Sequence, residues 1–154
     1  MALSTEYSAR LEKIQQEKMS EGFMTRRKGI IESEGFKNSK LVAYEDLFKL
    51  SFSLSFYDTS NLENLNFKLY GGFFERNKAL QNFAGLKEYN FYSFISELEV
   101  EILLIRGKSD LTLLEADVRV VNADHLIVME ESGHFPFVEE KKKYLKVVSN
   151  FLKH

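Results

Sequence analysis

The chain of 154 residues contains no cysteine, no tryptophan and a single proline, Pro136. The absence of cysteine excludes a disulfide scaffold, a thiolate zinc site and a cysteine nucleophile. It is also typical of proteins in a reducing compartment, and we expect this protein to be cytoplasmic. The shortage of proline favours long helices with few rigid turns.

The sequence also lacks an excess of either charge and any long hydrophobic run. Its 21 basic and 23 acidic residues are well mixed, so we expect no basic surface that binds nucleic acid. No stretch approaches 18 apolar residues and the N-terminus turns polar at Ser4, so we expect neither a membrane span nor a signal peptide. With 44% hydrophobic and 29% charged residues, the composition is that of a globular protein.

The first part of the chain, residues 1–88, has the pattern of a helical region. Apolar residues recur there at helical spacing, and Ser, Gly and Asp residues mark the expected helix ends. The predicted helices are Ser4–Gly22, Thr25–Glu34, Ser39–Phe56, Leu62–Tyr70 and Phe73–Phe83. The sequence before Val100 also holds 11 of the 14 Phe and six of the seven Tyr. These aromatic residues fit either a wall over a substrate pocket or the core of a helical layer, and we favour the core.

The rest of the chain, residues 89–154, has a different pattern. Two short apolar runs, Val100–Gly107 and Leu126–Met129, predict strands that are buried on both faces. A helix-compatible stretch joins them, and a final helix carries Glu139 and Glu140 near its positive end. This order predicts a right-handed crossover with two parallel strands. Because two strands do not form a stable sheet by themselves, we expect further strands to be missing from the chain.

Two short motifs resemble cofactor sites but lack the residues that such sites need. Gly107-Lys108-Ser109 ends like a phosphate-binding loop, but Ile102 stands where that loop requires glycine. Glu131 and His134 have the spacing used in di-iron bundles, but Ser132-Gly133 between them predicts a turn, and no second motif exists. We therefore expect no cofactor and no metal.

Two polar residues follow the predicted strands and are the candidate catalytic residues. Asp110 comes just after the first strand, and His134 comes after the second. Parallel neighbouring strands bring their carboxyl ends to one edge of a sheet, so we expect these side chains to lie within or near hydrogen-bonding reach. A carboxylate in that position orients an imidazole and stabilises its charged form during general-base catalysis.

The residues around this pair resemble a known family. Ile102–Asp110 is similar to the seventh strand and acid loop of the α/β-hydrolase fold, and Leu126–Glu140 is similar to its eighth strand, catalytic-histidine loop and last helix. The most specific part is Gly133-His134-Phe135-Pro136 followed by two glutamates. The similarity is closest to proline iminopeptidases and related small-molecule hydrolases, and it covers residues 89–154.

The resemblance implies an α/β fold class with two parts. Residues 1–88 would form a helical lid, and residues 89–154 would form the C-terminal strand-helix-strand-helix part of the hydrolase core. The implied activity is hydrolysis of an ester, amide or N-terminal prolyl bond in a small molecule or peptide by a Ser-His-Asp mechanism. In that mechanism Asp110 is the orienting acid and His134 is the general base.

The nucleophile motif of that family, Gly-x-Ser-x-Gly, does not occur in the sequence. The string Ser51-Phe52-Ser53-Leu54-Ser55 lies in an apolar helical run and is interpreted as packing. We therefore expect the chain alone to be inactive. Its expected partner is the N-terminal half of the hydrolase, on the same or a separate chain, or a second copy of itself. The alternative hypothesis is a non-catalytic helical binding module or a hydrolase remnant.

Overall fold

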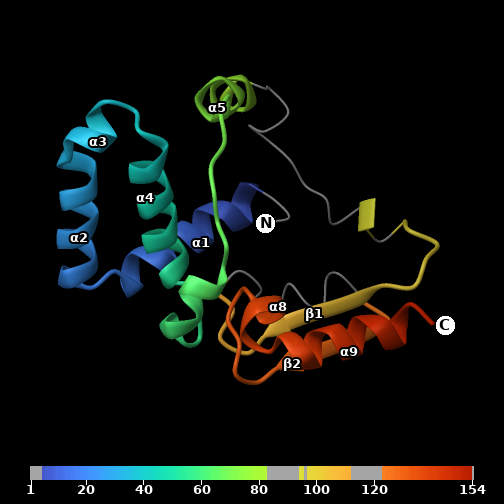
Figure 1. Cartoon of the computed structure of the whole chain (residues 1–154). Coiled ribbons are helices and arrows are strands. Elements are labelled where there is room, and N and C mark those ends of the chain that lie inside the picture. Colours follow the sequence, from blue (N-terminus) through green and yellow to red (C-terminus); the bar gives the residue numbers. More distant parts are fainter. Residues whose placement is uncertain (1–4, 83–93, 96, 112–122, 154) are drawn as a thin grey trace. The chain divides into compact units, whose positions relative to one another are not determined.

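A computed structural model of the chain describes residues 5–82, 94–95, 97–111 and 123–153 (Figure 1). These residues form two compact units. The helical unit comprises residues 5–54 and 66–82, and the sheet unit comprises residues 55–65 and the described residues from 94 onward. The predicted boundary between residues 88 and 89 lies outside the described residues. In the described part of the chain, no helix is long and apolar enough to cross a membrane.

The helical unit contains five helices among its described residues, which are α1 (Thr5–Lys18), α2 (Glu21–Glu32), α3 (Glu34–Lys37), α4 (Leu41–Ser53) and α5 (Phe73–Gln81). The prediction that the first helix continues to Gly22 is wrong. It ends at Lys18 because Ser20 starts a new helix, and the Ser20 hydroxyl accepts a hydrogen bond from the Phe23 amide at 3.2 Å. Gly22 lies in the first turn of α2.

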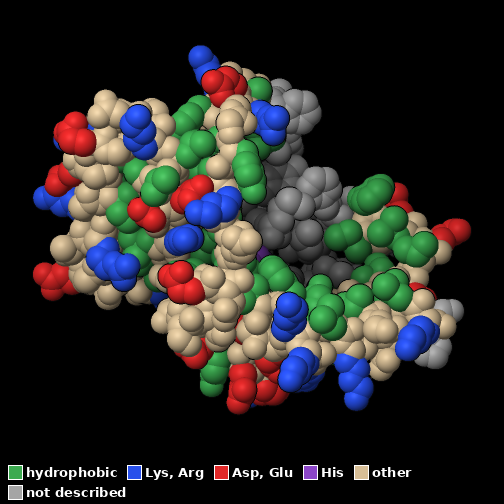
Figure 2. All heavy atoms as spheres, viewed as in Figure 1, with side chains coloured by type: hydrophobic (Ala, Val, Ile, Leu, Met, Phe, Trp, Pro, Cys, Tyr) green, Lys and Arg blue, Asp and Glu red, His purple; other side chains and the backbone are tan. Residues whose placement is uncertain are grey.

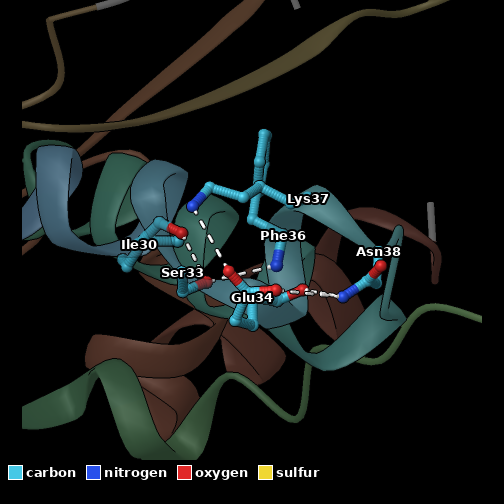
Figure 3. Close-up of polar contacts among 6 residues, drawn as sticks. All are labelled: Ile30, Ser33, Glu34, Phe36, Lys37 and Asn38. Carbon is cyan, nitrogen blue, oxygen red and sulfur yellow. Dashed lines mark hydrogen bonds and ion pairs between the residues drawn. The ribbon is translucent and has the colours of Figure 1, made fainter.

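The corner between α2 and α3 is stabilised by one serine, as Figure 3 shows. The Ser33 hydroxyl donates a hydrogen bond to the Ile30 carbonyl at 2.6 Å, and it accepts one from the Phe36 amide at 3.1 Å. Asn38 closes the single turn of α3 by donating its side-chain amide to the Glu34 carbonyl at 2.9 Å. Because the chain reverses at this corner, α2 and α4 lie side by side (Figure 1).

The aromatic residues of the helical unit pack against one another. Tyr44 stacks on Phe36 with ring centroids 4.4 Å apart. One turn further along α4, Phe48 contacts Phe67 at 5.5 Å and Phe73 at 6.0 Å. Such edge and stacked contacts are typical of a hydrophobic core. The structure therefore supports the interpretation of the aromatic stripe as a core.

A buried glutamate explains why the predicted helix Leu62–Tyr70 does not form. Glu45 is only 6% exposed, and its carboxylate accepts hydrogen bonds from the Leu69 amide at 2.8 Å and from Lys68 Nζ at 3.3 Å. The hydrogen bond from the Leu69 amide is the main reason that the pKa of the Glu45 carboxyl lies below its ordinary value. Since the Leu69 amide is used by this carboxylate, the segment after Leu65 runs without helical structure.

The sheet unit contains a 3₁₀ helix, η1 (Thr59–Asn64), two strands, β1 (Leu103–Gly107) and β2 (His125–Met129), and two helices, α8 (Pro136–Glu139) and α9 (Lys141–Phe151). The strands are parallel, with Leu104 opposite Leu126 and Gly107 opposite Met129, which confirms the predicted pairing. The helix predicted between them, Leu111–Val121, lies outside the described residues except at Leu111. The predicted last helix is divided, because the chain turns at Glu140 between α8 and α9.

Burial of the strands differs from the prediction. Helix α9 covers one face of the pair, where Phe151 contacts His125 with ring centroids 5.7 Å apart. Leu126 and Val128 of β2 are 45% and 37% exposed, so the prediction that this strand is buried on both faces is wrong. The exposed leucine and valine follow from the small size of the described sheet, which has two strands. The lysine run Lys141–Lys143 at the start of α9 is exposed, and Figure 2 shows lysine side chains along this helix.

Residues 55–65 leave the helical region and pack in the sheet unit. Helix α4 ends at Ser53, three residues before the predicted end at Phe56. Phe56 is buried and stacks on Phe135 with ring centroids 4.7 Å apart. The Asp58 side chain then starts η1 by accepting a hydrogen bond from the Ser60 amide at 2.9 Å.

Candidate active site

Asp110 and His134 face each other at the carboxyl ends of the two strands. The distances from His134 Nδ1 to Asp110 Oδ2 and Oδ1 are 3.0 and 3.2 Å. Because β1 and β2 are parallel, the loops that follow them leave from the same edge of the sheet. The predicted proximity of these two side chains is confirmed.

The two side chains differ in their access to solvent. The Asp110 side chain is 4% exposed, whereas that of His134 is 30% exposed. An ionised carboxylate only accepts hydrogen bonds, so a hydrogen bond between His134 Nδ1 and an ionised Asp110 requires the proton on Nδ1. Both residues line an open cavity of about 460 Å³, whose other walls include Leu104, Phe137 and Tyr144. The pair thus combines a buried acid with an accessible imidazole beside an apolar surface.

The loop that carries Asp110 (residues 108–110) is hydrogen-bonded to the loop that carries His134 (residues 130–135, called the histidine loop). The Lys108 amide donates to the Met129 carbonyl at 2.8 Å, and the Ser109 amide donates to the Ser132 carbonyl at 3.0 Å. The Asp110 amide closes a turn by donating to the Gly107 carbonyl at 3.2 Å. These backbone bonds continue the contact between the strands beyond their ends and fix the spacing of the two loops.

Two glycines allow these backbones to approach. A Cβ on Gly107 would lie 2.0 Å from the Gly133 carbonyl oxygen and 2.3 Å from that of Ser132. A Cβ on Gly133 would in turn lie 2.1 Å from the Ser55 carbonyl oxygen. The histidine loop is therefore packed between the end of β1 and the segment after α4, with no space for a side chain on either glycine.

Glu140 holds the first half of the histidine loop. One carboxylate oxygen accepts hydrogen bonds from the Glu131 amide at 3.0 Å and from the buried Ser132 hydroxyl at 2.8 Å. Burial opposes the ionisation of Glu140, but the bonds from Ser132, Lys143 and Glu131 outweigh it and hold the pKa of this carboxyl below its ordinary value.

Glu139 holds the second half of the loop and connects it to residues 55–58. Its Oε2 accepts a hydrogen bond from the Gly133 amide at 2.7 Å, while its Oε1 accepts bonds from the Tyr57 and Asp58 amides at 2.9 and 3.0 Å. The His134 amide donates to the Ser55 carbonyl at 2.7 Å. The backbone of His134 is thus attached to a segment nearly 80 positions earlier in the chain.

The sequence pattern placed Glu139 and Glu140 near a helix start and in the stretch that resembles the α/β-hydrolase histidine loop and last helix, but it gave neither residue a role in holding that loop. Their position after Gly-His-Phe-Pro was the available signal for such a role. Residues 55–58 carried no such signal, because they contribute backbone groups rather than a recognisable motif. The serine string fits the packing interpretation only in part. Ser51 is exposed and Ser53 is half-buried, and both donate their hydroxyls to helix carbonyls, those of Leu47 and Leu50, at 3.0 and 2.6 Å, whereas the buried Ser55 follows the helix.

The chemistry that this arrangement can perform is proton transfer by an oriented imidazole. Among the described residues, no three acidic or histidine side chains gather as a metal site. Comparison with known proteins adds no further information, because no family model, no curated protein and no solved structure matches the chain. The functional interpretation therefore depends on the geometry of Asp110 and His134.

The close approach at Gly107 predicts a large effect of a small substitution. Gly107→Ala should lower the stability of the sheet unit by about 3 kcal/mol, the upper end of the cost of overpacking, because the added methyl meets backbone and not a movable side chain. Gly29→Ala is the matched control. Gly29 lies within α2 with nothing within 4 Å of its Cβ position, so alanine should stabilise that helix by about 0.5–1 kcal/mol. Hydrogen exchange at the amides of β1 and α2 measures both effects, and unchanged exchange in β1 of Gly107→Ala would contradict the packing described.

The lowered pKa of Glu140 predicts a dependence of stability on pH. Since its pKa is lower in the folded than in the unfolded chain, its stabilisation is complete above the ordinary value of 4.5 and is lost as pH falls through the lowered value. Glu140→Gln should lose about 1.5–3 kcal/mol at pH 7, the range for hydrogen bonds to a charged group. Urea denaturation between pH 3 and 7 should show this loss shrinking below pH 4.5. A constant loss across that range would show that the charge of Glu140 does not hold the loop.

Proposed function

We propose that the chain is the C-terminal part of an α/β-hydrolase that acts on ester, amide or N-terminal prolyl bonds. In this proposal Asp110 is the acid and His134 the general base of a Ser-His-Asp triad, and the helical unit serves as the lid. The observation that carries the proposal is the pair of contacts from His134 Nδ1 to the buried Asp110 carboxylate, at 3.0 and 3.2 Å, where two parallel strands end.

The proposed mechanism uses the two nitrogens of the imidazole differently. Asp110 holds the proton on Nδ1, which leaves Nε2 as the basic atom that takes the proton of a serine hydroxyl. As the serine attacks the carbonyl carbon, His134 becomes an imidazolium, and the Asp110 carboxylate stabilises its charge. His134 then gives its Nε2 proton to the leaving alcohol or amine, and water repeats the cycle on the acyl-enzyme.

The serine is proposed to come from the N-terminal half of the hydrolase, in the same or a separate chain. That half would also continue the sheet beside β1, because two five-residue parallel strands are too few for a stable sheet. The exposed Leu126 and Val128 of β2 are consistent with a sheet face that requires additional cover. The substrate would be a small molecule or a peptide, and the reaction needs no cofactor.

The first prediction from this proposal concerns labelling by a fluorophosphonate probe. The chain alone should not be labelled, because an acid and a base without a nucleophile cannot form an acyl-enzyme. When it is combined with a segment that carries Gly-x-Ser-x-Gly, that serine should be labelled. Asp110→Asn should slow the labelling by up to about 10⁴-fold, because the imidazole then adopts the wrong tautomer. The matched control is His125→Gln, which changes the histidine at the opposite end of β2 and should leave the labelling rate unchanged.

Two results would contradict the proposal in different ways. Labelling of the isolated chain at one of its own serines would show that the nucleophile has been misplaced. Equal labelling of the combined protein with and without the Asp110 carboxylate would show that the pair is not part of the reaction. Specific binding of a protein to the helical unit, without any labelling, would instead support the alternative hypothesis of a non-catalytic binding module.

The second prediction concerns association. Among the residues that the structure describes, β1 pairs only with β2, so its other edge, beside apolar Leu103, Leu104 and Ile105, can act as a template for another strand. The purified chain should therefore self-associate or bind its N-terminal half. Light scattering gives its mass, and hydrogen exchange at Leu103–Ile105 reports the edge. A monodisperse monomer with fast exchange at these amides and a cooperative melt would contradict this prediction.

A further inference from the structure

We propose that Glu139 is a positioning residue for His134, because its carboxylate connects the histidine loop to residues 55–58 and thereby keeps the imidazole against Asp110. This inference rests on the proposed role of His134 as general base. Its test measures the state of the imidazole and not turnover. A failure of the positioning role can therefore be distinguished from a failure of the hydrolase proposal.

The first argument is the number and origin of the groups that this carboxylate binds. Glu139 accepts three backbone hydrogen bonds, from Gly133 at 2.7 Å, Tyr57 at 2.9 Å and Asp58 at 3.0 Å. Hydrogen bonds to an ionised carboxylate are about twice as strong as neutral ones. A single side chain therefore holds two segments that are more than 70 residues apart in the chain.

The second argument is the place of these bonds relative to His134. The Gly133 amide is the immediate neighbour of the histidine, and the His134 amide itself donates to the Ser55 carbonyl at 2.7 Å. Ser55 lies two residues before Tyr57, so Glu139 also fixes the acceptor that holds the His134 backbone. Any displacement of residues 55–58 is thus transmitted to the histidine through its backbone.

The third argument is the close packing of the backbone at this point of the loop. The Gly133 backbone lies so close to the Ser55 carbonyl that a Cβ would be 2.1 Å from its oxygen. Such an approach of backbone groups is stable only if their polar atoms are satisfied. The Glu139 carboxylate satisfies the Gly133 amide, and the rings of Phe56 and Phe135, which follow Ser55 and His134 in the chain, stack with centroids 4.7 Å apart.

The test compares Glu139→Ala and Glu139→Gln with the matched control Glu131→Gln. Glu131 lies in the same loop and is exposed, so its substitution removes the same charge without removing the bonds described above. Long-range ¹H–¹⁵N NMR of the full chain measures the tautomer of His134 at neutral pH, with Asp110→Ala as the reference for an imidazole released from the carboxylate. Amide hydrogen exchange at Gly133 and His134 measures how well the histidine loop is held. Circular dichroism, together with exchange at β1, shows whether the fold is retained.

We expect the Nδ1–H tautomer in the unmodified chain and in Glu131→Gln. In Glu139→Ala, the imidazole should approach the tautomer mixture of Asp110→Ala, and exchange at Gly133 and His134 should rise about ten- to hundred-fold while β1 stays protected. Glu139→Gln keeps one accepting oxygen and should give an intermediate result. It also provides the test if the alanine variant does not fold.

The inference would be overturned if folded Glu139→Ala or Glu139→Gln kept the Nδ1–H tautomer with exchange at His134 within twofold of the unmodified chain. It would also be overturned if Glu131→Gln produced the same release, since the effect would then come from loop charge in general. Release of the imidazole together with absence of labelling in the combined protein would retain the positioning role and reject the hydrolase proposal.

Discussion

The contact of the Gly107 backbone with the Ser132–Gly133 backbone determines the geometry at the end of the sheet unit. No side chain separates the two loops, and their amides and carbonyls bond directly at 2.8 and 3.0 Å. Because the loops are fixed at this distance, the side chains that follow are close together, with His134 Nδ1 3.0 Å from Asp110 Oδ2. A larger separation of the backbones would leave the buried Asp110 carboxylate without this partner, which is costly for an ionised group.

The carboxylates of Glu139 and Glu140 complete this arrangement from the other side. They bind consecutive parts of the histidine loop, and Glu139 extends the network to residues 55–58. The acidic charges are accommodated because both carboxylates accept backbone amide hydrogen bonds, and Glu140 also accepts bonds from the Ser132 hydroxyl and from Lys143. The sheet unit is thus organised around a loop with its polar groups satisfied, while the helical unit has its own aromatic core along α4.

The features that the sequence predicted are those with a local pattern. Two short apolar runs, one ended by Gly107 and the other by a polar turn after Met129, predicted the parallel strands. The polar residues after these runs, Asp110 and His134, were predicted to lie close together. The features that it did not predict depend on hydrogen bonds from backbone amides to carboxylates that are distant in the chain. The Glu45 carboxylate takes the Leu69 amide from a predicted helix, and Glu139 takes those of Tyr57 and Asp58. Every residue type except proline supplies such an amide donor, so no sequence pattern marks them.

The central claim is that Asp110 and His134 are the acid and base of a hydrolase whose serine lies outside these 154 residues. The most direct measurement is the DNA sequence immediately upstream of the Met1 codon, in the same and in the neighbouring reading frames. The account predicts coding sequence there with alternating strand and helix patterns and one Gly-x-Ser-x-Gly between a strand and a helix. Upstream coding sequence without that motif, or no coding sequence in any frame, would contradict it.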